Sequence, residues 1–299
     1  MHAIRVHIFG DPDVLAYEET PTPQAQGEQV LVKVAAAGVN PVDTYIRAGA
    51  YAGLPELPYV PGKDGAGTLP DGRRVYLSGS LTGTYADYCL CSPDQVHPLP
   101  AGVSFEQGAT LGVPYATAYQ ALFHRGQAQP GQRLLVRGGS GAVGLAAIQL
   151  AVARGLRVTA TASSEAGRAL LLAQGAETAV EHAQTDGPYE LILEMLANRN
   201  LDRDLDELAS GGTVVVVGNR GRVEIDPRKT MGKELTIRGM ALFNATPEEH
   251  RRIHAGLQAG LASGVLKPIV REALPLVEAA QAHRQVLEPG ACGNLVLIP

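Results

Sequence analysis

The sequence contains no tryptophan, only three cysteines and no long uninterrupted apolar run. Three cysteines (Cys89, Cys91 and Cys292) cannot build a disulfide framework. A membrane span needs about 18–20 consecutive apolar residues. The first ten residues, MHAIRVHIFG, alternate like a strand and lack the apolar core of a secretion signal. These absences argue against a secreted or membrane-embedded protein and predict a cytoplasmic one.

No charge of one sign dominates the chain. It carries 25 Lys and Arg against 30 Asp and Glu, which gives a net charge of −5. Without a broad basic field, nucleic acid is not an expected partner. The 299 residues predict two domains, at about 100–200 residues per domain.

Two parts of the sequence differ in pattern. In the first part, QVLVKVAAAGV, GRRVYL and YADYCLC are short strand candidates separated by glycine and proline. After about Phe105, RLLVRGG, LRVTATA, YELILE and GTVVVVG alternate mostly with helical patterns, which is typical of a parallel sheet. We therefore predict an α/β protein with a β-rich domain over residues 1–108, completed by 245–299, and a doubly wound Rossmann domain over 109–244.

A glycine-rich loop, GGSGAVG, lies between the predicted strand RLLVR and a predicted helix. It places Gly139, Gly141 and Gly144 at the spacing of a dinucleotide-binding turn. The first glycine would form the tight turn, the second would admit a pyrophosphate, and the third would allow close helix packing. The helix N-terminus would then attract the pyrophosphate.

The end of the next strand, TASSEAGR, indicates which dinucleotide binds. An NAD site places an acidic residue about 20 residues after the loop, where it holds the ribose 2′-hydroxyl. Here Ser163 and Ser164 take that place, and Arg168 follows. Glu165 is a competing acid, but as an early helix residue it would serve the N-terminus of its own helix. The sequence favours NADP(H).

Long stretches of the chain resemble one enzyme family. They are GVNPVDTYIRAGAY, GGSGAVGLAAIQLA, LEMLANRNLDRDL and VVVVGNRGRVEIDPRKTMGKELTIRGMALFNATPEE. The chain resembles the zinc-free, zeta-crystallin-like quinone oxidoreductases of the medium-chain dehydrogenase/reductase superfamily. The resemblance implies a GroES-like catalytic domain, a Rossmann domain and reduction of quinones by NADPH. Two alternatives stay open: reduction of activated C=C bonds in enones or enoyl thioesters, and a non-enzymatic RNA-binding or structural role.

The same resemblance predicts that no metal is bound. Zinc-dependent relatives have a cysteine ligand at the position of Asn40 and a Gly-His-Glu segment at the position of GKDGAG. A catalytic zinc site needs three protein ligands, and this sequence does not assemble them. The segment that follows GKDGAG is shorter than in relatives, which leaves the rim of the substrate cleft open to question.

The stretch VNPVDTYIRAGAY is too polar for a core strand and too interrupted for a good helix. The resemblance implies that Asn40, Asp43, Tyr45 and Tyr51 line the catalytic cleft, with Tyr45 touching the cofactor. The alternative is that both tyrosines pack between domains while Asp43 caps a turn.

Further cofactor contacts are expected along the second domain. Ala142 stands where relatives have glycine, and Asn219 where they have serine. Apart from Tyr45, the expected contacts are Thr117, Ser140, Gly141, Ala142, Val143, Ser163, Arg168, His182, Asn198, Gly218, Asn219, Arg220, Leu242 and Phe243.

Other features have simpler explanations or concern assembly. Cys89 and Cys91 are expected to pack in the core, and His250 and His254 to lie on a solvated helix face. The strand ELTIRGM, residues 234–240, is expected at the edge of the parallel sheet, where it would pair with a second copy. The expected assembly is a homodimer, with a tetramer as the alternative.

Overall fold

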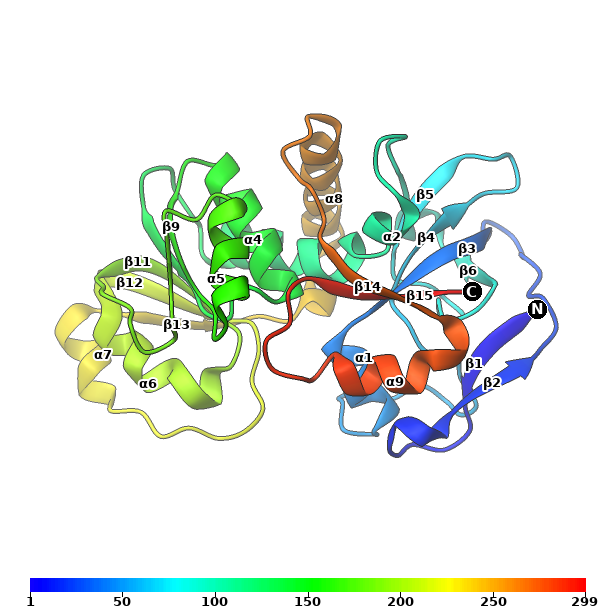
Figure 1. Ribbon diagram of the computed structural model, residues 1–299, viewed down its shortest axis with the longest axis horizontal. Helices are drawn as coiled ribbons and strands as arrows, with labels where there is room; N and C mark the ends of the chain where they lie inside the picture. Colours follow the sequence, from blue (N-terminus) through cyan, green and yellow to red (C-terminus); the bar gives the residue numbers. More distant parts are fainter. The chain divides into compact units, whose positions relative to one another are not determined.

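The computed structural model describes residues 1–299 and divides them into two compact units (Figure 1). The first unit comprises Met1–Pro114 and Lys267–Pro299, and the second comprises Tyr115–Leu266. These boundaries differ from the expected ones at 108 and 245. Helix α8 (Pro247–Ala262) groups with the second unit because it packs on α3 (Ala116–Tyr119).

The first unit is built on β structure, as the sequence predicts. A seven-stranded sheet has the order β14-β15-β3-β4-β5-β7, with β6 paired to β3, and β1 and β2 form a separate ribbon. The strands are β1 (His2–Val6), β2 (Leu15–Glu19), β3 (Val30–Val39), β4 (Asp64–Thr68), β5 (Arg74–Ser78), β6 (Tyr88–Cys91), β7 (Val96–Pro98), β14 (Val270–Pro275) and β15 (Asn294–Ile298).

Strand β3 is the centre of this sheet. On one side it pairs with β4, and on the other it pairs with β6 near its start and β15 near its end. Its small residues are needed for packing, since a Cβ at Gly38 would lie 2.1 Å from the carbonyl oxygen of Ala109. The helical segments of this unit are η1 (Pro12–Val14), α1 (Pro41–Arg47), η2 (Pro93–Gln95), α2 (Phe105–Gly108), η3 (Leu111–Tyr115, which crosses the unit boundary), η6 (Leu276–Glu278) and α9 (Ala279–Gln285).

The second unit contains the predicted parallel sheet. Its six strands have the order β10-β9-β8-β11-β12-β13, and every neighbouring pair is parallel. The predicted edge position of the last strand is confirmed. The strands are β8 (Arg133–Val136), β9 (Arg157–Thr161), β10 (Thr178–Val180), β11 (Tyr189–Glu194), β12 (Leu208–Val216) and β13 (Thr236–Gly239).

Helices cover both faces of this sheet. Helices α4 and α5 pack against β8, β9 and β10, while α6 and α7 pack on the opposite face, against β11 and β12 (Figure 1). The strand order reverses between β8 and β11, which is where doubly wound sheets bind ligands. The remaining helical segments are η4 (Gln120–Arg125), α4 (Ala142–Ala153), α5 (Glu165–Ala173), α6 (Ala197–Glu207), α7 (Pro227–Lys233) and η5 (Leu242–Asn244).

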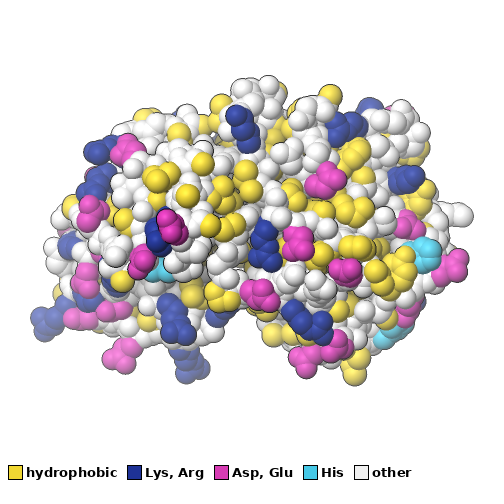
Figure 2. Space-filling model, in the orientation of Figure 1, with side chains coloured by type: hydrophobic (Ala, Val, Ile, Leu, Met, Phe, Trp, Pro, Cys, Tyr) yellow, Lys and Arg dark blue, Asp and Glu magenta, His cyan; other side chains and the backbone are white.

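The helices and the surface charges are those expected from the amino-acid composition. No helix combines the length and apolar character required to cross a bilayer. On the face shown in Figure 2, basic and acidic side chains are interspersed rather than gathered by sign.

Candidate functional site

The glycine-rich loop leads into an open helix N-terminus. Helix α4 begins after Gly141, and no side chain caps it. The first bond of the helix joins the N–H of Leu145 to the carbonyl of Gly141 at 2.9 Å. The N–H groups of Ala142, Val143 and Gly144 therefore have no protein acceptor. Three parallel donors and the positive end of a helix dipole make a site that fits a phosphate anion.

The glycines of the loop have distinct roles, one of which differs from the prediction. The positive φ of the turn (66°) falls on Gly138 and not on Gly139. Gly139 instead packs against β9, where a Cβ would lie 3.0 Å from that of Ala160. Gly144 allows the helix to approach the loop, since its Cβ would lie 2.6 Å from the Cα of Gly139. At Gly141 a Cβ would meet only one protein atom within 4 Å, an oxygen at 3.5 Å, so the space beside it is open to a ligand.

Beyond β9, the two expected serines have different roles. The hydroxyl of Ser164 accepts the N–H of Gly167 at 3.0 Å and thereby caps α5. Ser163 is exposed and its hydroxyl makes no hydrogen bond in the protein. Glu165 lies exposed in the first turn of α5, as expected for an acid that serves its own helix. Only Ser163 is thus available to a ligand.

Arg168 reaches back from α5 to the end of β9. Its guanidinium donates to the carbonyls of Ala162 and Ser163, both at 3.3 Å. It also forms an ion pair with Glu181 at 3.5 Å. A cation therefore lies beside the place where the expected 2′-phosphate would bind, and the acid Glu181 lies next to that cation.

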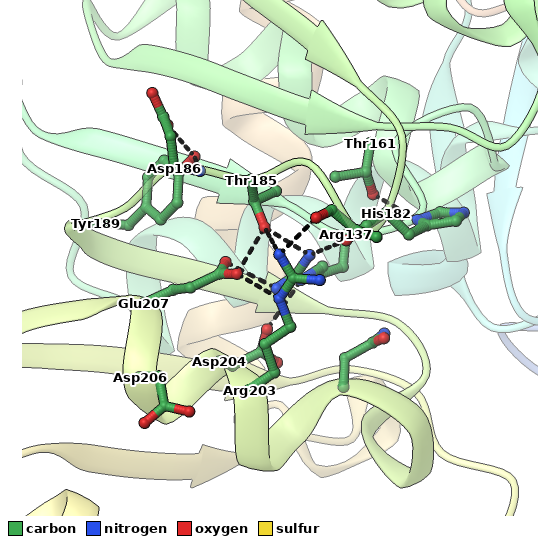
Figure 3. Close-up of polar contacts among 12 residues, drawn as sticks. Arg137, Thr161, His182, Thr185, Asp186, Tyr189, Arg203, Asp204, Asp206 and Glu207 are labelled. Atoms are coloured by element: carbon green, nitrogen blue, oxygen red, sulfur yellow. Dashed lines mark hydrogen bonds and ion pairs between the residues drawn. The ribbon is translucent and has the colours of Figure 1, made fainter.

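A buried arginine anchors this end of the sheet (Figure 3). Arg137 follows β8 directly and is 1% exposed. Its guanidinium donates to Asp204 at 2.9 Å and to Glu207 at 2.8 Å, both on α6. It also donates to the carbonyl of His182 at 2.9 Å and to the hydroxyl of Thr185 at 3.2 Å. Arg137 thus fixes the segment after β10 against α6.

His182 is joined to the glycine loop through one threonine. The Thr161 hydroxyl accepts the N–H of Gly138 at 3.0 Å and bonds Nδ1 of His182 at 2.8 Å. Burial, with a smaller contribution from the charge of Arg137, lowers the pKa of His182. A neutral ring with Nδ1 engaged leaves Nε2 as the nitrogen free to meet a ligand.

A second buried acid lies behind the arginine. Glu194 ends β11, and both Glu194 and Asp204 are fully buried. Burial and then the charge of Glu194 raise the pKa of Asp204 to about 8. Glu194 accepts from the Asn200 amide at 3.1 Å and from the N–H of Leu196. The guanidinium of Arg137 opposes this rise in the pKa of Asp204, so Arg137 stabilises a pair of buried acids.

The stretch that begins at Asn40 does form a helix, and the expectation that it was too interrupted was wrong. The N–H of Asn40 donates to Oδ2 of Asp43 at 2.9 Å, and the N–H of Asp43 donates to the Asn40 carbonyl at 3.0 Å. Pro41 occupies the first turn of the helix, where its missing N–H costs nothing. The Asn40 side chain is used elsewhere: its amide donates to Oδ2 of Asp64 at 2.9 Å.

These groups belong to a buried polar network in the first unit. Burial raises the pKa of Asp43 to about 7 and that of Asp64 well above its usual range. The Tyr85 hydroxyl lies 3.5 Å from Asp43 and 3.2 Å from Nε2 of His283. Burial lowers the pKa of His283 to about 3, so its ring is neutral. The network therefore favours the protonated form of both acids, and their polar atoms are hydrogen-bonded within the network.

The two tyrosines differ from the acids beside them. Tyr45 and Tyr51 are half-buried, and their hydroxyls make no hydrogen bond within the protein. Asn40 and Asp43, by contrast, are 3% and 2% exposed. Only the tyrosine hydroxyls of this predicted cluster are free donors for a ligand.

Several of the expected cofactor residues of the second unit come together. The Asn198 amide oxygen accepts the N–H of Arg220 at 2.9 Å, and the Asn219 amide donates to the Gly221 carbonyl at 2.7 Å. A Cβ at Gly218 would lie 2.3 Å from a carbonyl oxygen, so glycine is needed there. The ends of β11 and β12 thus present these residues as one group.

Three other expected contacts are not linked to this group by hydrogen bonds. Thr117 is buried in α3. Leu242 and Phe243 lie in η5 after β13, with Phe243 half exposed.

The cysteine pair and the histidine pair, which the sequence placed outside the site, have different outcomes. Cys89 and Cys91 are buried, as expected, with Sγ atoms 4.0 Å apart, and their contact together with burial raises the pKa of Cys89. The expected solvated face at His250 and His254 was wrong, because His254 is buried and the two rings lie 4.4 Å apart.

The comparisons with known proteins cover the whole chain. Residues 142–257 match a family model described as zinc-binding dehydrogenase, and residues 26–101 match the alcohol dehydrogenase GroES-like domain. The quinone oxidoreductase of Mus musculus is 44% identical over 323 residues, which covers 100% of this chain and 98% of that protein. The human quinone oxidoreductase is 43% identical over 321 residues, with coverage of 100% and 98%.

The chain belongs to the quinone oxidoreductase family of medium-chain dehydrogenases/reductases. Members of this family are oxidoreductases that use a nicotinamide cofactor. The solved quinone oxidoreductase of Thermus thermophilus, also described in complex with NADPH, matches with a TM-score of 0.92 and 33% identity over 100% of both chains. A mycobacterial protein solved with NADPH matches with a TM-score of 0.90 and 27% identity, again over 100% of both chains. The predicted fold class and enzyme class are confirmed.

The residues that lie behind the candidate site were not predicted from the sequence. Asp64, Tyr85 and His283 lie far apart in sequence and meet only through the sheet and α9. Arg137 and Asp204 are likewise brought together by the fold. A signal was present in one case, because an arginine directly after an apolar parallel strand must find buried partners.

Proposed function

We propose that this enzyme reduces quinones by direct hydride transfer from NADPH and does so without zinc. The observation that carries the proposal is the open N-terminus of α4, with three free N–H groups behind a glycine loop that leaves space beside Gly141. When bound, NADPH supplies the hydride, and the protein supplies binding, orientation and donors.

The preference for NADPH over NADH is supported by the end of β9. Ser163 is exposed, and two main-chain carbonyls hold Arg168 beside it. No acid follows β9 directly in a position to accept from a ribose 2′-hydroxyl, since Glu165 lies in the first turn of α5. Arg168 would pair with the 2′-phosphate, and Ser163 would donate to it.

Independence from zinc is supported by the chemistry of the available donors. The Asn40 amide nitrogen, engaged with Asp64, cannot act as a metal ligand as a cysteine thiolate would. The thiols of Cys89 and Cys91 lie in the core of the first unit. Residues 142–257, which match the zinc-binding description, contain no cysteine. These donors do not fit a catalytic zinc site, so no step is assigned to a metal.

The predicted catalytic residues divide into two roles. Asn40 and Asp43 would position α1, because their polar atoms are used to cap the helix and to bind Asp64. Tyr45 and Tyr51 would donate hydroxyl hydrogen bonds, Tyr45 toward the cofactor and Tyr51 toward the acceptor oxygen on which charge develops.

Other residues would complete the cofactor site. Ser140, Ala142 and Val143 would bind the pyrophosphate through the loop and the helix start. Nε2 of His182, the free ring nitrogen, would face the adenosine half. The residues that remain as proposed contacts are Thr117, Asn198, Gly218, Asn219, Arg220, Leu242 and Phe243.

The exposed edge of the parallel sheet supports a homodimer. Strand β13 pairs with β12 on one side only, and Ile237 on it is 38% exposed. We expect two copies to join through this edge. Light scattering on the Ile237→Asp variant should show a monomer and the unchanged protein a dimer, whereas Leu172→Asp, an exposed site on α5, should stay dimeric. A monomeric unchanged protein would contradict this.

The substrate class is tested with a panel of quinones, enones and enoyl thioesters. With NADPH, kcat/KM should be highest for quinones, and prior treatment with a chelator should leave it unchanged. Higher values for enones would replace the proposal with alkene reduction, for which a half-exposed tyrosine could serve as the acid.

A further inference from the structure

One exposed acid lies next to the proposed 2′-phosphate site. Glu181 directly follows β10, the strand beside β9, and its carboxylate lies 3.5 Å from the Arg168 guanidinium. Arg168 is itself held in place, since it donates to the carbonyls of Ala162 and Ser163. The cation that is proposed to bind the 2′-phosphate is therefore already paired with Glu181.

The position of Glu181 is fixed by the fold. The carbonyl of the next residue, His182, accepts from the buried Arg137 at 2.9 Å, and the His182 ring bonds Thr161 at 2.8 Å. The carbonyl of Glu181 itself accepts the N–H of Gln184 at 3.0 Å. The carboxylate is therefore carried by an anchored segment, which distinguishes it from an acid at the tip of a free loop.

We propose that Glu181 determines cofactor specificity by competing with the 2′-phosphate for Arg168. This inference rests on the proposed use of NADPH. Two anions cannot both pair closely with one guanidinium without repelling each other, so the phosphate must displace the carboxylate or bind beside it at a cost. NADH has no 2′-phosphate and does not meet this competition. Glu181 therefore lowers the discrimination in favour of NADPH that Arg168 creates.

The test is calorimetric titration of Glu181→Gln with NADPH and with NADH. NADPH should bind about two- to fivefold more tightly than to the unchanged protein, as expected for the removal of a partly exposed ion pair. NADH should bind with unchanged affinity. The matched control is Glu177→Gln, because Glu177 pairs with Arg157 at 3.2 Å and its side chain has the same exposure of 53%. That variant should change neither affinity.

A double-mutant cycle separates this inference from the function on which it rests. Arg168→Gln should weaken NADPH binding, and adding Glu181→Gln to this variant should not increase its NADPH affinity. If Arg168→Gln leaves NADPH affinity unchanged, the proposed 2′-phosphate contact fails, and this inference with it. If Arg168→Gln weakens NADPH binding but Glu181→Gln does not tighten it, only the role of Glu181 fails. Weaker NADH binding by Glu181→Gln would show instead that the carboxylate holds a 2′-hydroxyl.

Discussion

Helices α1 and α4 begin in opposite ways. At α1 the carboxylate of Asp43 accepts the N–H of Asn40, so the chain closes its own helix start. At α4 no side chain caps the helix, and three N–H groups after Gly141 have no acceptor. Because a free helix N-terminus carries partial positive charge, the open one can bind an anion from outside the chain. The difference supports the proposal that the N-terminus of α4 binds the cofactor phosphates, while α1 is a structural support.

The groups behind the two helix starts differ as well. Behind α1, Asp43 and Asp64 are buried without a bonded cation, and both have raised pKa values. Behind the loop that precedes α4, Arg137 pairs with Asp204 and with Glu207. A cluster that contains a buried cation thus anchors the glycine loop, and nearly neutral acids anchor α1.

The largest expected effect comes from breaking the anchor behind α4. Asp204→Leu would leave the buried Arg137 without a main partner, which costs about 3–5 kcal/mol of the free energy of unfolding. Urea denaturation measures this loss. The control is Asp206→Leu on the same helix, whose exposed side chain pairs with Lys229; it should cost less than about 1 kcal/mol. Equal losses in the two variants would mean that the Arg137 cluster is not an anchor.

Filling the space beside the open helix start should abolish binding but keep the fold. Gly141→Val has room within the protein, because the nearest atom to its Cβ lies at 3.5 Å. We expect NADPH affinity to fall about 100-fold, which corresponds to about 2.7 kcal/mol. Fluorescence titration with NADPH measures it, and Gly102→Val, at a site with nothing within 4 Å, is the control. Unchanged affinity in Gly141→Val would refute the loop as the pyrophosphate site.

The closed helix start can be tested through pH. The folded pKa of Asp43 is about 7, raised from 3.8 by burial. Its contribution to stability is therefore present below about pH 4 and is lost as the pH rises through 7. Asp43→Asn keeps an acceptor for the Asn40 N–H but has no charge. Relative to the unchanged protein, the free energy of unfolding of this variant should rise by about 1 to 4 kcal/mol between pH 4 and pH 8.

A second aspartate gives the opposite sign for comparison. Asp71 is exposed, and its backbone and side-chain bonds to Arg73 lower its pKa. Asp71→Asn should therefore show no gain as the pH rises. Denaturation curves at pH 4, 6 and 8 provide the comparison. If the difference in the free energy of unfolding between Asp43→Asn and the unchanged protein does not change with pH, Asp43 does not have a raised pKa.

The smallest expected effect concerns the free hydroxyls on and beside α1. Tyr45→Phe and Tyr51→Phe each remove one donor, which should lower kcat/KM for a quinone about two- to tenfold. Tyr51→Phe should leave NADPH affinity unchanged, whereas Tyr45→Phe should weaken it. The exposed Tyr17, changed to Phe, is the control. If neither variant changes kinetics, the tyrosines only pack, which is the alternative that the sequence left open.

Local patterns in the sequence predicted much of the fold. The apolar runs, the glycine loop and the edge strand depend on neighbouring residues, and the structure has them in the expected order. Helix α1 was missed because its cap depends on the reciprocal bonds of Asn40 and Asp43, which outweigh the interruptions nearby. The first compact unit resumes at Lys267 rather than at the expected 245, because α8 contacts α3, and periodicity does not reveal such a tertiary contact.

The candidate site was predicted less completely than the fold. A spacing rule indicates a phosphate loop, and an absent acid indicates NADP, since both are read within one βαβ unit. The pairs Asn40 with Asp64 and Arg137 with Asp204 are 24 and 67 residues apart in sequence. Their partners become known only when strands and helices are placed side by side. For the same reason, Glu181 beside Arg168 could not be predicted from the local pattern.

Hydrogen exchange of individual backbone amides tests the contrast between the two helix starts most directly. Without cofactor, the amides of Ala142, Val143 and Gly144 should exchange quickly and that of Asn40 slowly, because only the latter has a protein acceptor. With saturating NADPH, the three amides of α4 should become strongly protected. No change at residues 142–144 on NADPH binding, or protection there without it, would contradict the assignment of the α4 N-terminus as the phosphate site.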